Sequence, residues 1–253
     1  RKVAVVILDS PTTAMHSSIA LLAKAAGVSE PTVNCFCHRL NTKGFPDFKL
    51  QLAQSLANGT PYVSRHVEQE DSVESYSGKI SESAMAGLDR VKQSLDTSAV
   101  NRAVDLLTQS KKIAFFGLGA SAAVAHDAMN KFFRFNVPVI YSDDIVMQRM
   151  SCMNSNEGDV MVLISHTGRT KSMVELARLA RENDATVEAI TSPDSPLARE
   201  ATLALTLDVP EDTDIYMPMV SRLAQLTLID VLATGFTLRR GAKFRDNLKR
   251  VKD

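Results

Sequence analysis

Between residues 111 and 240 the chain alternates short apolar runs with segments of helical periodicity, and this alternation limits the fold more than any other feature. The apolar runs are 113–117, 137–142, 160–165, 186–191 and 203–209. The helical patterns are 122–133, 145–153, 172–182 and 197–200, and a longer one at about 217–238 closes the series. Buried strands that alternate with helices are typical of a parallel sheet covered on both faces. We therefore predict an α/β unit with a doubly wound, five-stranded parallel sheet.

Residues 1–57 have the pattern of an all-helical domain. Apolar residues recur at helical spacing through 3–8, 19–26, 32–40 and 48–56. Gly27, Val28 and Ser29 join the second and third of these segments, with Ser29 placed to cap the next helix and Pro31 at an early helical position. A helix that ends at Gly, then a short turn and a capped helix, is the pattern of a helix-turn-helix. The segment 30–40 would then enter the major groove of DNA.

The chain changes character between these two regions. Residues 58–61 read Asn-Gly-Thr-Pro, and the acidic, apolar-poor stretch up to residue 78 indicates a linker or an exposed helix. Helical patterns follow from Lys79 and again at 100–107. We predict a helix-turn-helix domain at 1–57, a linker and connecting helix at 58–96, and the α/β domain at 97–253. Because the chain opens inside a helical pattern and without an initiator methionine, we expect further residues upstream of Arg1.

Charge is balanced over the whole chain, with 29 basic and 29 acidic residues, but it is unevenly distributed. Residues 1–57 carry six Lys or Arg and three Asp or Glu, a net +3, and the remainder carries 23 and 26, a net −3. The last fifteen residues hold seven basic and two acidic side chains, which indicates a solvated helix face or a contact with phosphates. The neutral total argues against wholesale coating of nucleic acid.

The cysteine content and the hydropathy of the chain narrow the class of protein further. Cys35, Cys37 and Cys152 are too few and too unevenly spaced for a disulfide framework or a zinc site. Reduced thiols in a cytoplasmic protein are the simplest interpretation, and we expect no metal and no cofactor. No apolar run approaches the ~20 residues of a membrane span, so we expect no membrane partner.

Two glycine- and hydroxyl-rich loops follow the first and third predicted strands. Residues 111–121 read KKIAFFGLGAS and residues 159–170 read DVMVLISHTGRT. Where a strand leads into a helix, unpaired helix N–H groups and Ser or Thr hydroxyls point at one place, which suits a phosphate. If the two strands are neighbours, the side chains that meet at one topological switch point are Ser121, Ser165, Thr167 and Thr170. The sequence thus predicts a site for a phosphorylated small molecule.

The first loop also matches the dinucleotide fingerprint, as Gly117-x-Gly119-x-x-Ala122, with Asp143 at the end of the next strand. This match keeps open a helix-turn-helix protein that senses NAD(H). The second loop favours the other interpretation, because three hydroxyls around Gly168 suit a phosphosugar and have no evident use for a dinucleotide.

The motifs GLGAS and SHTGRT resemble the sugar isomerase (SIS) phosphosugar-binding domain, in which the first and third strands lie side by side. GVSEPTVNCFCHRL and FPDFKLQLAQSL resemble the RpiR family of bacterial transcription regulators. The likeness continues through DTDIYMPMVSR and LIDVLATGFTLRRG, so that it covers nearly the whole chain. The chain most resembles repressors of hexose catabolism. This resemblance implies operator DNA as the partner and 2-keto-3-deoxy-6-phosphogluconate as the effector.

The resemblance also implies an effector site on both loops. Its members would be Gly119, Ser121, Ser165, His166, Thr167, Gly168 and Thr170. Ser121 and Ser165 would hold the phosphate, the two threonines would complete the cradle, and backbone groups near the glycines would approach closely. His166 and Arg169 either contact the effector or face solvent.

The predicted DNA contacts lie on or beside the second helix of the turn. They are Ser29, Thr32, Asn34, Cys35, His38, Arg39 and Lys43. Thr32 and Asn34 could equally be surface residues of a generic helix. Members of the resembling family usually carry Arg where this chain has Cys35 and His38. Arg pairs with guanine edges through two hydrogen bonds, which Cys cannot do, so we expect altered or weakened operator binding, by ~1–3 kcal/mol for each lost contact.

A sugar-phosphate isomerase needs a general base near the reacting carbons, for which Glu175, Glu211 and His166 are candidates. No acid–base pair stands out, and a solvated carboxylate explains both glutamates better. We therefore expect a non-enzymatic regulator that forms at least a homodimer through apolar helix faces such as 217–238. Effector binding would release DNA by changing the spacing of the two reading helices, although activation stays open. An NAD(H)-sensing repressor and a phosphosugar isomerase remain the alternatives.

Overall fold

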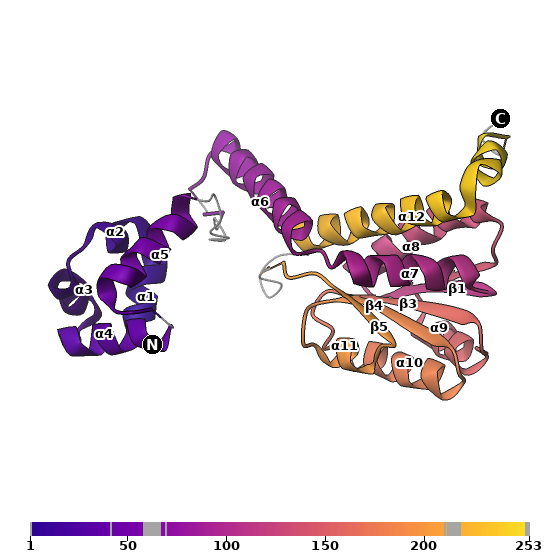
Figure 1. The fold of residues 1–253 in the computed structure, drawn as a ribbon, viewed down its shortest axis with the longest axis horizontal. Helices are drawn as coiled ribbons and strands as arrows, with labels where there is room; N and C mark the ends of the chain where they lie inside the picture. Colours follow the sequence, from indigo (N-terminus) through magenta and orange to yellow (C-terminus); the bar gives the residue numbers. More distant parts are fainter. Residues whose placement is uncertain are drawn as a thin grey trace. The chain divides into compact units, whose positions relative to one another are not determined.

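In the computed structural model the chain divides into two units, Arg1–Val63 and Ser64–Asp253, each with its own hydrophobic core (Figure 1). The structure describes residues 2–40, 42–57, 67–68, 70–209, 211 and 219–250. Most of the predicted linker before residue 67 and the first residues of the predicted closing helix, 217 and 218, lie outside the described residues.

The first unit is helical, as predicted. Its helices are α1 (Lys2–Asp9), α2 (Pro11–His16), α3 (Ile19–Ala26), α4 (Glu30–Arg39) and α5 (Phe45–Ala57). The side chain of Ser18 accepts a hydrogen bond from the Leu21 N–H and starts α3, and Gly27 ends it in the left-handed conformation with φ 58°. Pro31 lies in the first turn of α4, where its missing N–H leaves no bond unmade. Helices α3 and α4 form the predicted helix-turn-helix.

Helix α2 is an addition to the helices predicted from the sequence. Its sequence, PTTAMH, has too few apolar residues to show helical periodicity. Packing supplies what the pattern lacks, because Ala14 is buried in the core of the unit. That core also contains Val3, Ile7, Leu22, Val33, Cys37, Phe45 and Phe48.

The second unit begins with α6 (Val73–Ser94) and α7 (Thr97–Gln109). Helix α6 starts at Val73 rather than near Lys79, because the side chain of Ser72 accepts a hydrogen bond from the Ser75 N–H and caps it. A local cap therefore extends the helix into the apolar-poor stretch, and the exposed-helix alternative holds for residues 73–78.

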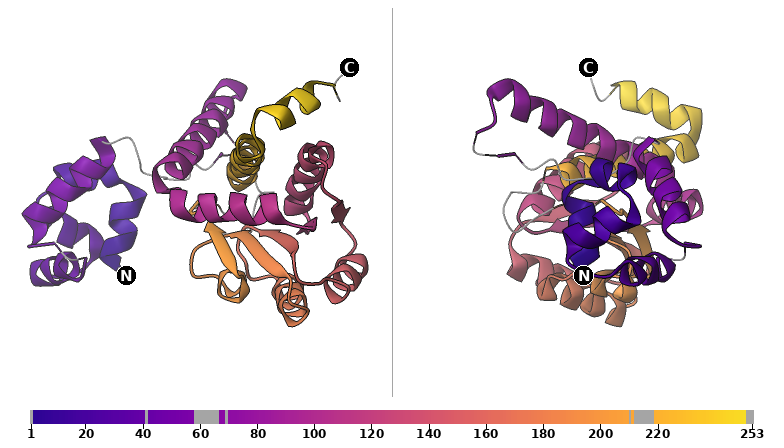
Figure 2. Two further views of the ribbon diagram at one scale, coloured as in Figure 1. Left: turned by 45° about the vertical axis from the view of Figure 1, so that its right-hand side comes forward. Right: turned by 90° about the vertical axis from the view of Figure 1, so that its left-hand side faces the viewer.

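The sheet has five parallel strands in the order β2-β1-β3-β4-β5. They are β1 (Lys112–Gly117), β2 (Val139–Ser142), β3 (Asp159–Ser165), β4 (Thr186–Thr191) and β5 (Leu203–Thr206). The connecting helices are α8 (Ala120–Phe132), which the 3-10 turn η1 (Phe133–Phe135) follows, α9 (Ile145–Met153), α10 (Lys171–Glu182) and α11 (Pro196–Glu200). Helices α7, α8 and α12 (Val220–Arg250) cover one face and α9, α10 and α11 the other (Figure 2). The predicted doubly wound fold is confirmed.

Both faces of the sheet are buried, and one carries an ionisable group. Paired residues in neighbouring parallel strands point to the same face, and one such row runs Phe115, Val162, Glu188, Leu203 across four strands. Among the described residues, neither carboxylate oxygen of Glu188 has a hydrogen-bond partner. Complete burial raises the pKa of Glu188 well above its usual value and favours the neutral acid.

Helix α12 is longer than the predicted closing helix and bends at Gly241, where φ is 80° and ψ is −170°. Before the bend, the ring of Phe236 lies 5.6 Å from that of Phe132 and 5.0 Å from that of Phe135. Beyond it, Phe244 lies 6.0 Å from Phe236. This aromatic cluster fixes α12 against α8 and η1.

Two arginines of the basic C-terminal segment contact other residues of the second unit. Arg239 pairs with Asp105 of α7 at 2.9 Å, and Arg240 lies over the rings of Phe236 and Phe244 at 5.7 and 5.3 Å. These two residues therefore belong to a helix face, which is the first of the two alternatives for this segment.

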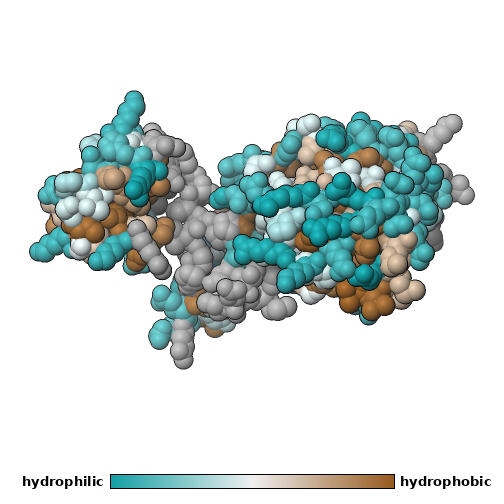
Figure 3. Space-filling view, turned by 90° about the horizontal axis from the view of Figure 1, so that it is seen from below, coloured by the Kyte–Doolittle hydropathy of each residue, from teal (hydrophilic) through white to brown (hydrophobic). Residues whose placement is uncertain are grey.

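The surface of the second unit differs between its helices. Seen from below, it is mainly hydrophilic and is interrupted by a hydrophobic patch (Figure 3). On α10 and α11, Arg178 pairs with Glu200 at 2.8 Å. On α9, in contrast, Val146, Met147, Met150 and Met153 are 51–60% exposed.

Candidate functional site

The strand order places a topological switch point between β1 and β3, because the chain continues from β1 to one neighbour and returns on the other side. Gly117 at the end of β1 is in register with Ile164 near the end of β3. The loops after both strands therefore leave the same edge of the sheet side by side, as expected. The dinucleotide-binding fold instead has the order 3-2-1-4-5-6, so the sheet does not favour the NAD(H) interpretation of the first loop.

The first loop closes tightly onto α8. A Cβ atom on Gly117 would lie 2.5 Å from the Ser121 carbonyl oxygen, so only glycine fits there. Gly119 precedes α8 with φ 58° and ψ −127°, a conformation that glycine adopts readily. Ser121 is half-buried in the first turn of α8.

The N-termini of α8 and α10 differ from those of their neighbours. A Ser or Asp side chain caps α6, α7, α9 and α11. No side chain caps α8, which starts after Gly119, or α10, which starts after the exposed Thr170. The first N–H groups of these two helices and their positive dipole ends therefore suit an external anion.

The second loop packs on two hydroxyl groups, one on the last residue of β4 and one in the loop that follows it. Gly168 has φ 59°, and a Cβ atom there would lie 2.3 Å from Ser195 Oγ and 2.4 Å from Thr191 Oγ1. Those two oxygens are 3.1 Å apart and share a hydrogen bond. The Leu197 N–H donates to the Gly168 carbonyl at 3.1 Å. Only glycine at position 168 thus allows the second loop to approach the segment between β4 and α11 this closely.

A third hydroxyl-rich loop completes the site, and the sequence analysis missed it. The N–H and the hydroxyl of Ser192 donate to the His166 carbonyl at 2.9 and 2.6 Å. The signal was present as TSPDSP at 191–196, directly after a strand that ends at the same edge. Its two serines, Ser192 and Ser195, suit a phosphate for the same reason as the serines of the other loops.

A cavity of about 510 Å³ opens at this edge of the sheet. Its lining consists of His166, Thr167, Arg169, Ser192, Pro193, Asp194, Ser195, Pro196, Arg199, Asp208, Val209 and Glu211. Two of the predicted effector residues, His166 and Thr167, belong to this lining. The other five do not, although all lie in or directly beside the two neighbouring loops; they are Gly119, Ser121, Ser165, Gly168 and Thr170. Ser165 is 7% exposed at the end of β3 and is in register with Thr191.

Charges of both signs face the cavity. Arg199 donates to the Asp194 carbonyl at 2.7 Å, and Asp208 pairs with Arg90 of α6 at 2.5 Å. Burial lowers the pKa of His166, against the opposing charge of Glu211, so its ring is neutral at pH 7. A neutral imidazole has one donor and one acceptor nitrogen, which suits the hydroxyl groups of a sugar.

The two glutamates considered as isomerase bases have other partners. Glu175 is exposed on α10 and pairs with Arg149 of α9. Glu211 accepts hydrogen bonds from the Met219 and Val220 N–H groups at 2.5 and 2.7 Å, and from the Ser221 hydroxyl. Glu211 is therefore a cap for α12 rather than a solvated carboxylate.

Five of the predicted DNA-contacting residues are exposed along α4 and its start: Ser29, Thr32, Cys35, His38 and Arg39. A cavity of about 580 Å³ lies beside them. It is lined by Lys2, Val3, Val28, Pro31, Thr32, Cys35, Phe36 and Arg39. The hydroxyls of Ser29 and Thr32 lie 2.9 Å apart and bond to each other.

Asn34 and His38 make contacts within the unit. Asn34 Oδ1 accepts a hydrogen bond from the Phe45 N–H at 3.2 Å, at the start of α5. His38 Nδ1 lies 3.1 Å from the Thr42 carbonyl oxygen, and its Nε2 lies 3.5 Å from Asn34 Nδ2. These contacts tie α4 to α5. Lys43 is exposed in the turn between them.

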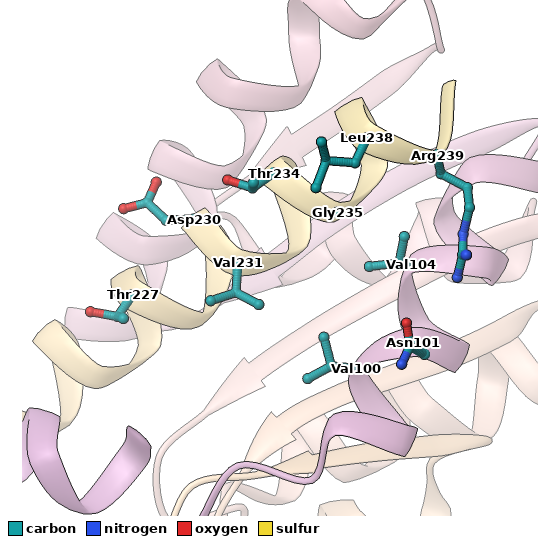
Figure 4. A pocket seen from close by; sticks show the side chains of 10 residues that line it. All are labelled: Val100, Asn101, Val104, Thr227, Asp230, Val231, Thr234, Gly235, Leu238 and Arg239. Carbon is teal, nitrogen blue, oxygen red and sulfur yellow. The ribbon is translucent and has the colours of Figure 1, made fainter. Parts of the chain in front are cut away.

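A second cavity of the α/β unit, of about 600 Å³, runs between α7 and α12 (Figure 4). Val100, Val104, Val231 and Leu238 line it with apolar side chains, and Leu238 is 63% exposed. Gly235 allows the two helices to approach, since a Cβ atom there would lie 2.6 Å from Val104 Cγ2. The groove has the character of a packing surface, in contrast to the polar cavity at the sheet edge.

Within the part of the chain that the structure describes, no three His, Cys, Asp or Glu residues are grouped to hold a metal ion. No helix among the described residues combines the length and the hydropathy that crossing a membrane requires. All three cysteines are free. Burial raises the pKa of Cys37, and that of Cys152 to about 12, whereas Cys35 is exposed.

Comparison with known families agrees with the two-unit organisation. Residues 1–59 match the helix-turn-helix domain of the rpiR family, and residues 106–235 match the SIS domain. The chain therefore belongs to the RpiR family of transcriptional regulators, in which a helix-turn-helix precedes a sugar-phosphate-binding domain.

Individual relatives are close. The chain is 80% identical over all 253 residues to the HTH-type transcriptional regulator HexR of Escherichia coli (strain K12), and it covers 88% of that protein. It is 54% identical over its whole length to HexR of Pseudomonas aeruginosa, of which it covers 89%. Among solved structures, Vibrio vulnificus NanR complexed with ManNAc-6P aligns with a TM-score of 0.66 and 26% identity, over 100% of this chain and 90% of that one. This chain is thus a regulator and not an isomerase.

Proposed function

We propose that this regulator represses genes of hexose catabolism, and that 2-keto-3-deoxy-6-phosphogluconate releases it from operator DNA. The observation that carries the proposal is that the loops before the uncapped N-termini of α8 and α10 leave the same edge of the sheet side by side, and that the second of these loops lines a 510 Å³ cavity together with the hydroxyl-rich loop after β4. The names of the HexR relatives support a role in hexose metabolism, and the ManNAc-6P bound to NanR supports a sugar phosphate as the class of ligand.

We assign the phosphate to the switch point and the carbon skeleton to the cavity. The proposed effector residues are Gly119, Ser121, Ser165, His166, Thr167, Gly168 and Thr170. Ser192 and Ser195 of the third loop join this set, because they line the same cavity. A phosphate between α8 and α10 would interact with N–H groups of both helices.

The DNA-contacting residues are assigned to the helix-turn-helix of residues 1–57, joined through residues 58–96 to the effector domain of residues 97–253. The proposed contacts are Ser29, Thr32, Asn34, Cys35, His38, Arg39 and Lys43. We place the protein in the cytoplasm, where both its DNA and its effector are found.

A homodimer would present two reading helices to two half-sites of an operator. The groove between α7 and α12 is the proposed dimer surface, because its exposed Leu238 and its valines offer apolar area to a second copy of the chain. Effector binding would favour a dimer in which the spacing of the reading helices no longer matches the operator.

The proposal is tested by thermal unfolding of the full chain against a panel of ligands. The panel holds 2-keto-3-deoxy-6-phosphogluconate, 6-phosphogluconate, glucose 6-phosphate, fructose 6-phosphate and NADH. A ligand at one hundred times its Kd stabilises the folded state by ~2.7 kcal/mol, which raises the Tm of a domain of this size by about 5–10 °C. We expect this rise with 2-keto-3-deoxy-6-phosphogluconate.

Variants locate the effect. Ser121→Ala and Ser165→Ala should each abolish the rise, whereas Ser81→Ala, which removes a hydroxyl bonded to its own helix, should retain it. A rise with NADH alone would overturn the phosphosugar assignment. A rise with another sugar phosphate would keep the site and replace the effector.

A further inference from the structure

Three residues after β5 line the cavity and at the same time contact the helices behind it. Asp208, Val209 and Glu211, here called the coupling residues, all belong to the cavity lining. Asp208 forms an ion pair with α6, Glu211 caps α12, and Val209 lies near Gly87 of α6, 3.8 Å from where a Cβ atom on that glycine would be. No other group of the cavity lining reaches α6 through an ion pair among the described residues.

The first connection is electrostatic. Arg90 of α6 pairs with Asp208 at 2.5 Å, and their side chains are 36% and 56% exposed. A pair as exposed as this adds little to stability, but it joins the cavity lining to α6. Negative charge entering the cavity would act directly on Asp208, and through it on Arg90.

The second connection is a packing contact without slack. Val220, the first residue of α12, fits against Gly87 of α6 so closely that a Cβ atom on Gly87 would lie 2.1 Å from Val220 Cγ1. The same Cβ atom would lie 3.8 Å from Val209 Cγ1. Because close-packed groups cannot interpenetrate, movement of the first turn of α12 toward α6 requires α6 to move as well.

The third connection sets the position of that first turn. Glu211 accepts hydrogen bonds from the N–H groups of Met219 and Val220, and both the N–H and the hydroxyl of Ser221 reach its second oxygen. Its carboxylate is also close enough to His166 to oppose the fall in that residue's pKa. An anionic ligand beside His166 would repel Glu211, and with it the start of α12.

We infer that the coupling residues transmit the occupancy of the cavity to α6, the first helix of the unit that follows the DNA-binding unit in the chain. This inference deepens the proposed function and depends on it, since it names how the effector would reach the DNA-binding unit. The transmission uses direct contacts on α6, through Arg90 and Gly87, and an indirect one through α12. Neither Arg90 nor Val220 lines the cavity, so substituting either removes no side chain that would contact the ligand directly.

The test is amide hydrogen exchange of the full chain with and without 2-keto-3-deoxy-6-phosphogluconate. Peptides that cover residues 165–171 report occupancy, and peptides that cover α6 report transmission. In the wild type we expect exchange to change in both regions, in α6 by about fivefold or more, the lower end of the range for coupled sites. In Arg90→Ala and in Val220→Ala we expect the occupancy signal to stay and the α6 response to fall below half.

Two controls complete the experiment. Arg90→Lys keeps the positive charge and should restore most of the α6 response. Arg149→Ala removes a different surface ion pair of the same unit, that with Glu175, and should change neither signal. Wild-type protein without any change at 165–171 would count against the proposed function itself. A change at 165–171 without an α6 response, or an undiminished α6 response in both Arg90→Ala and Val220→Ala, would overturn the inference and leave the effector site intact.

Discussion

Gly168 lies directly against Ser195: a Cβ atom added to Gly168 would be 2.3 Å from the Ser195 hydroxyl oxygen. The contact joins the loop after β3 to the loop after β4, and the Leu197 N–H adds a hydrogen bond to the Gly168 carbonyl. The backbone of Gly168, with φ 59°, therefore holds two of the three loops of the proposed effector site in one arrangement.

Gly168→Ala should destabilise the α/β unit and weaken effector binding. The left-handed backbone and the forced contact with Ser195 together should lower the free energy of unfolding by about 2–4 kcal/mol. Gly27→Ala is the matched control, since Gly27 has φ 58° but nothing within 4 Å of its Cβ position, and should cost only about 1–2 kcal/mol in its own unit. Urea denaturation with hydrogen exchange read separately in each unit measures both. Equal costs would show that the contact with Ser195 relaxes freely.

Glu188 should make the stability of the α/β unit fall as the pH rises. Its pKa in the folded protein is raised by burial, so between the unfolded value near 4.5 and the raised value the folded state binds the extra proton. Stability from this group is therefore intact below about pH 4.5 and is lost at up to ~1.36 kcal/mol per pH unit as the pH climbs toward the folded pKa.

Glu188→Met should remove this slope and stabilise the protein at pH 7 by about 1–3 kcal/mol, because an apolar side chain replaces an unpartnered acid between Val162 and Leu203. Glu200→Gln is the control of opposite sign. Arg178 lowers the pKa of Glu200, so that residue favours folding above the unfolded pKa and loses its effect only as the pH falls. Denaturation curves of both variants from pH 4 to 8 measure how stability depends on pH. An unchanged slope of stability against pH in Glu188→Met would contradict the assignment of that slope to Glu188.

The fold could be predicted from the sequence because its signals are local and repeated. Five apolar runs separated by helical patterns allow few architectures. The bounds of β4 are the same as those of the apolar run that predicted it. β2 is shorter than its run, since Pro138 has no N–H to donate to the ladder. Helix α2 and the early start of α6 escaped detection, because packing of Ala14 and a cap by Ser72 outweigh the weak periodicity.

The candidate effector site could be predicted only in part, for a related reason. Glycine and hydroxyl motifs place two loops at one edge of the sheet, and the register of β1 with β3 brings them together. Which side chains line a cavity depends on the approach of a third loop, which rests on Gly168 and on the bonds of Ser192 to the His166 carbonyl. The capping of α12 by Glu211 joins residues eight to ten positions apart in the sequence, and no periodic pattern predicts it.

Asn34→Ala should destabilise the helix-turn-helix unit, because it removes the acceptor of the Phe45 N–H at the start of α5. The loss of such a cap costs about 1 kcal/mol. Thr32→Ala is the control, since the Thr32 hydroxyl bonds only to that of Ser29 among the described residues at an exposed position. Hydrogen exchange over residues 30–52 reports the change. If Asn34→Ala instead leaves exchange unaltered and lowers the affinity for DNA, the residue acts as a reader of bases.

Cys35→Arg should strengthen operator binding. Cys35 is exposed on α4 and lines a cavity together with Thr32 and Arg39. An arginine that pairs with a guanine edge contributes about 1–3 kcal/mol, which is a gain of roughly 5- to 150-fold in affinity. If it contacts a phosphate instead, the slope of log K against log salt should steepen by about 0.9.

Cys35→Lys separates these two outcomes, because lysine supplies the charge without the planar, two-bond geometry of arginine. The measurement is a salt titration of affinity for a DNA fragment that the wild-type chain selects from random sequence. A gain with arginine alone, largest on fragments with guanine at one position, assigns base reading to residue 35. Equal gains with both variants on every fragment assign a phosphate contact. No gain with either would remove residue 35 from the DNA-contacting set and leave Arg39 as the basic reader on α4.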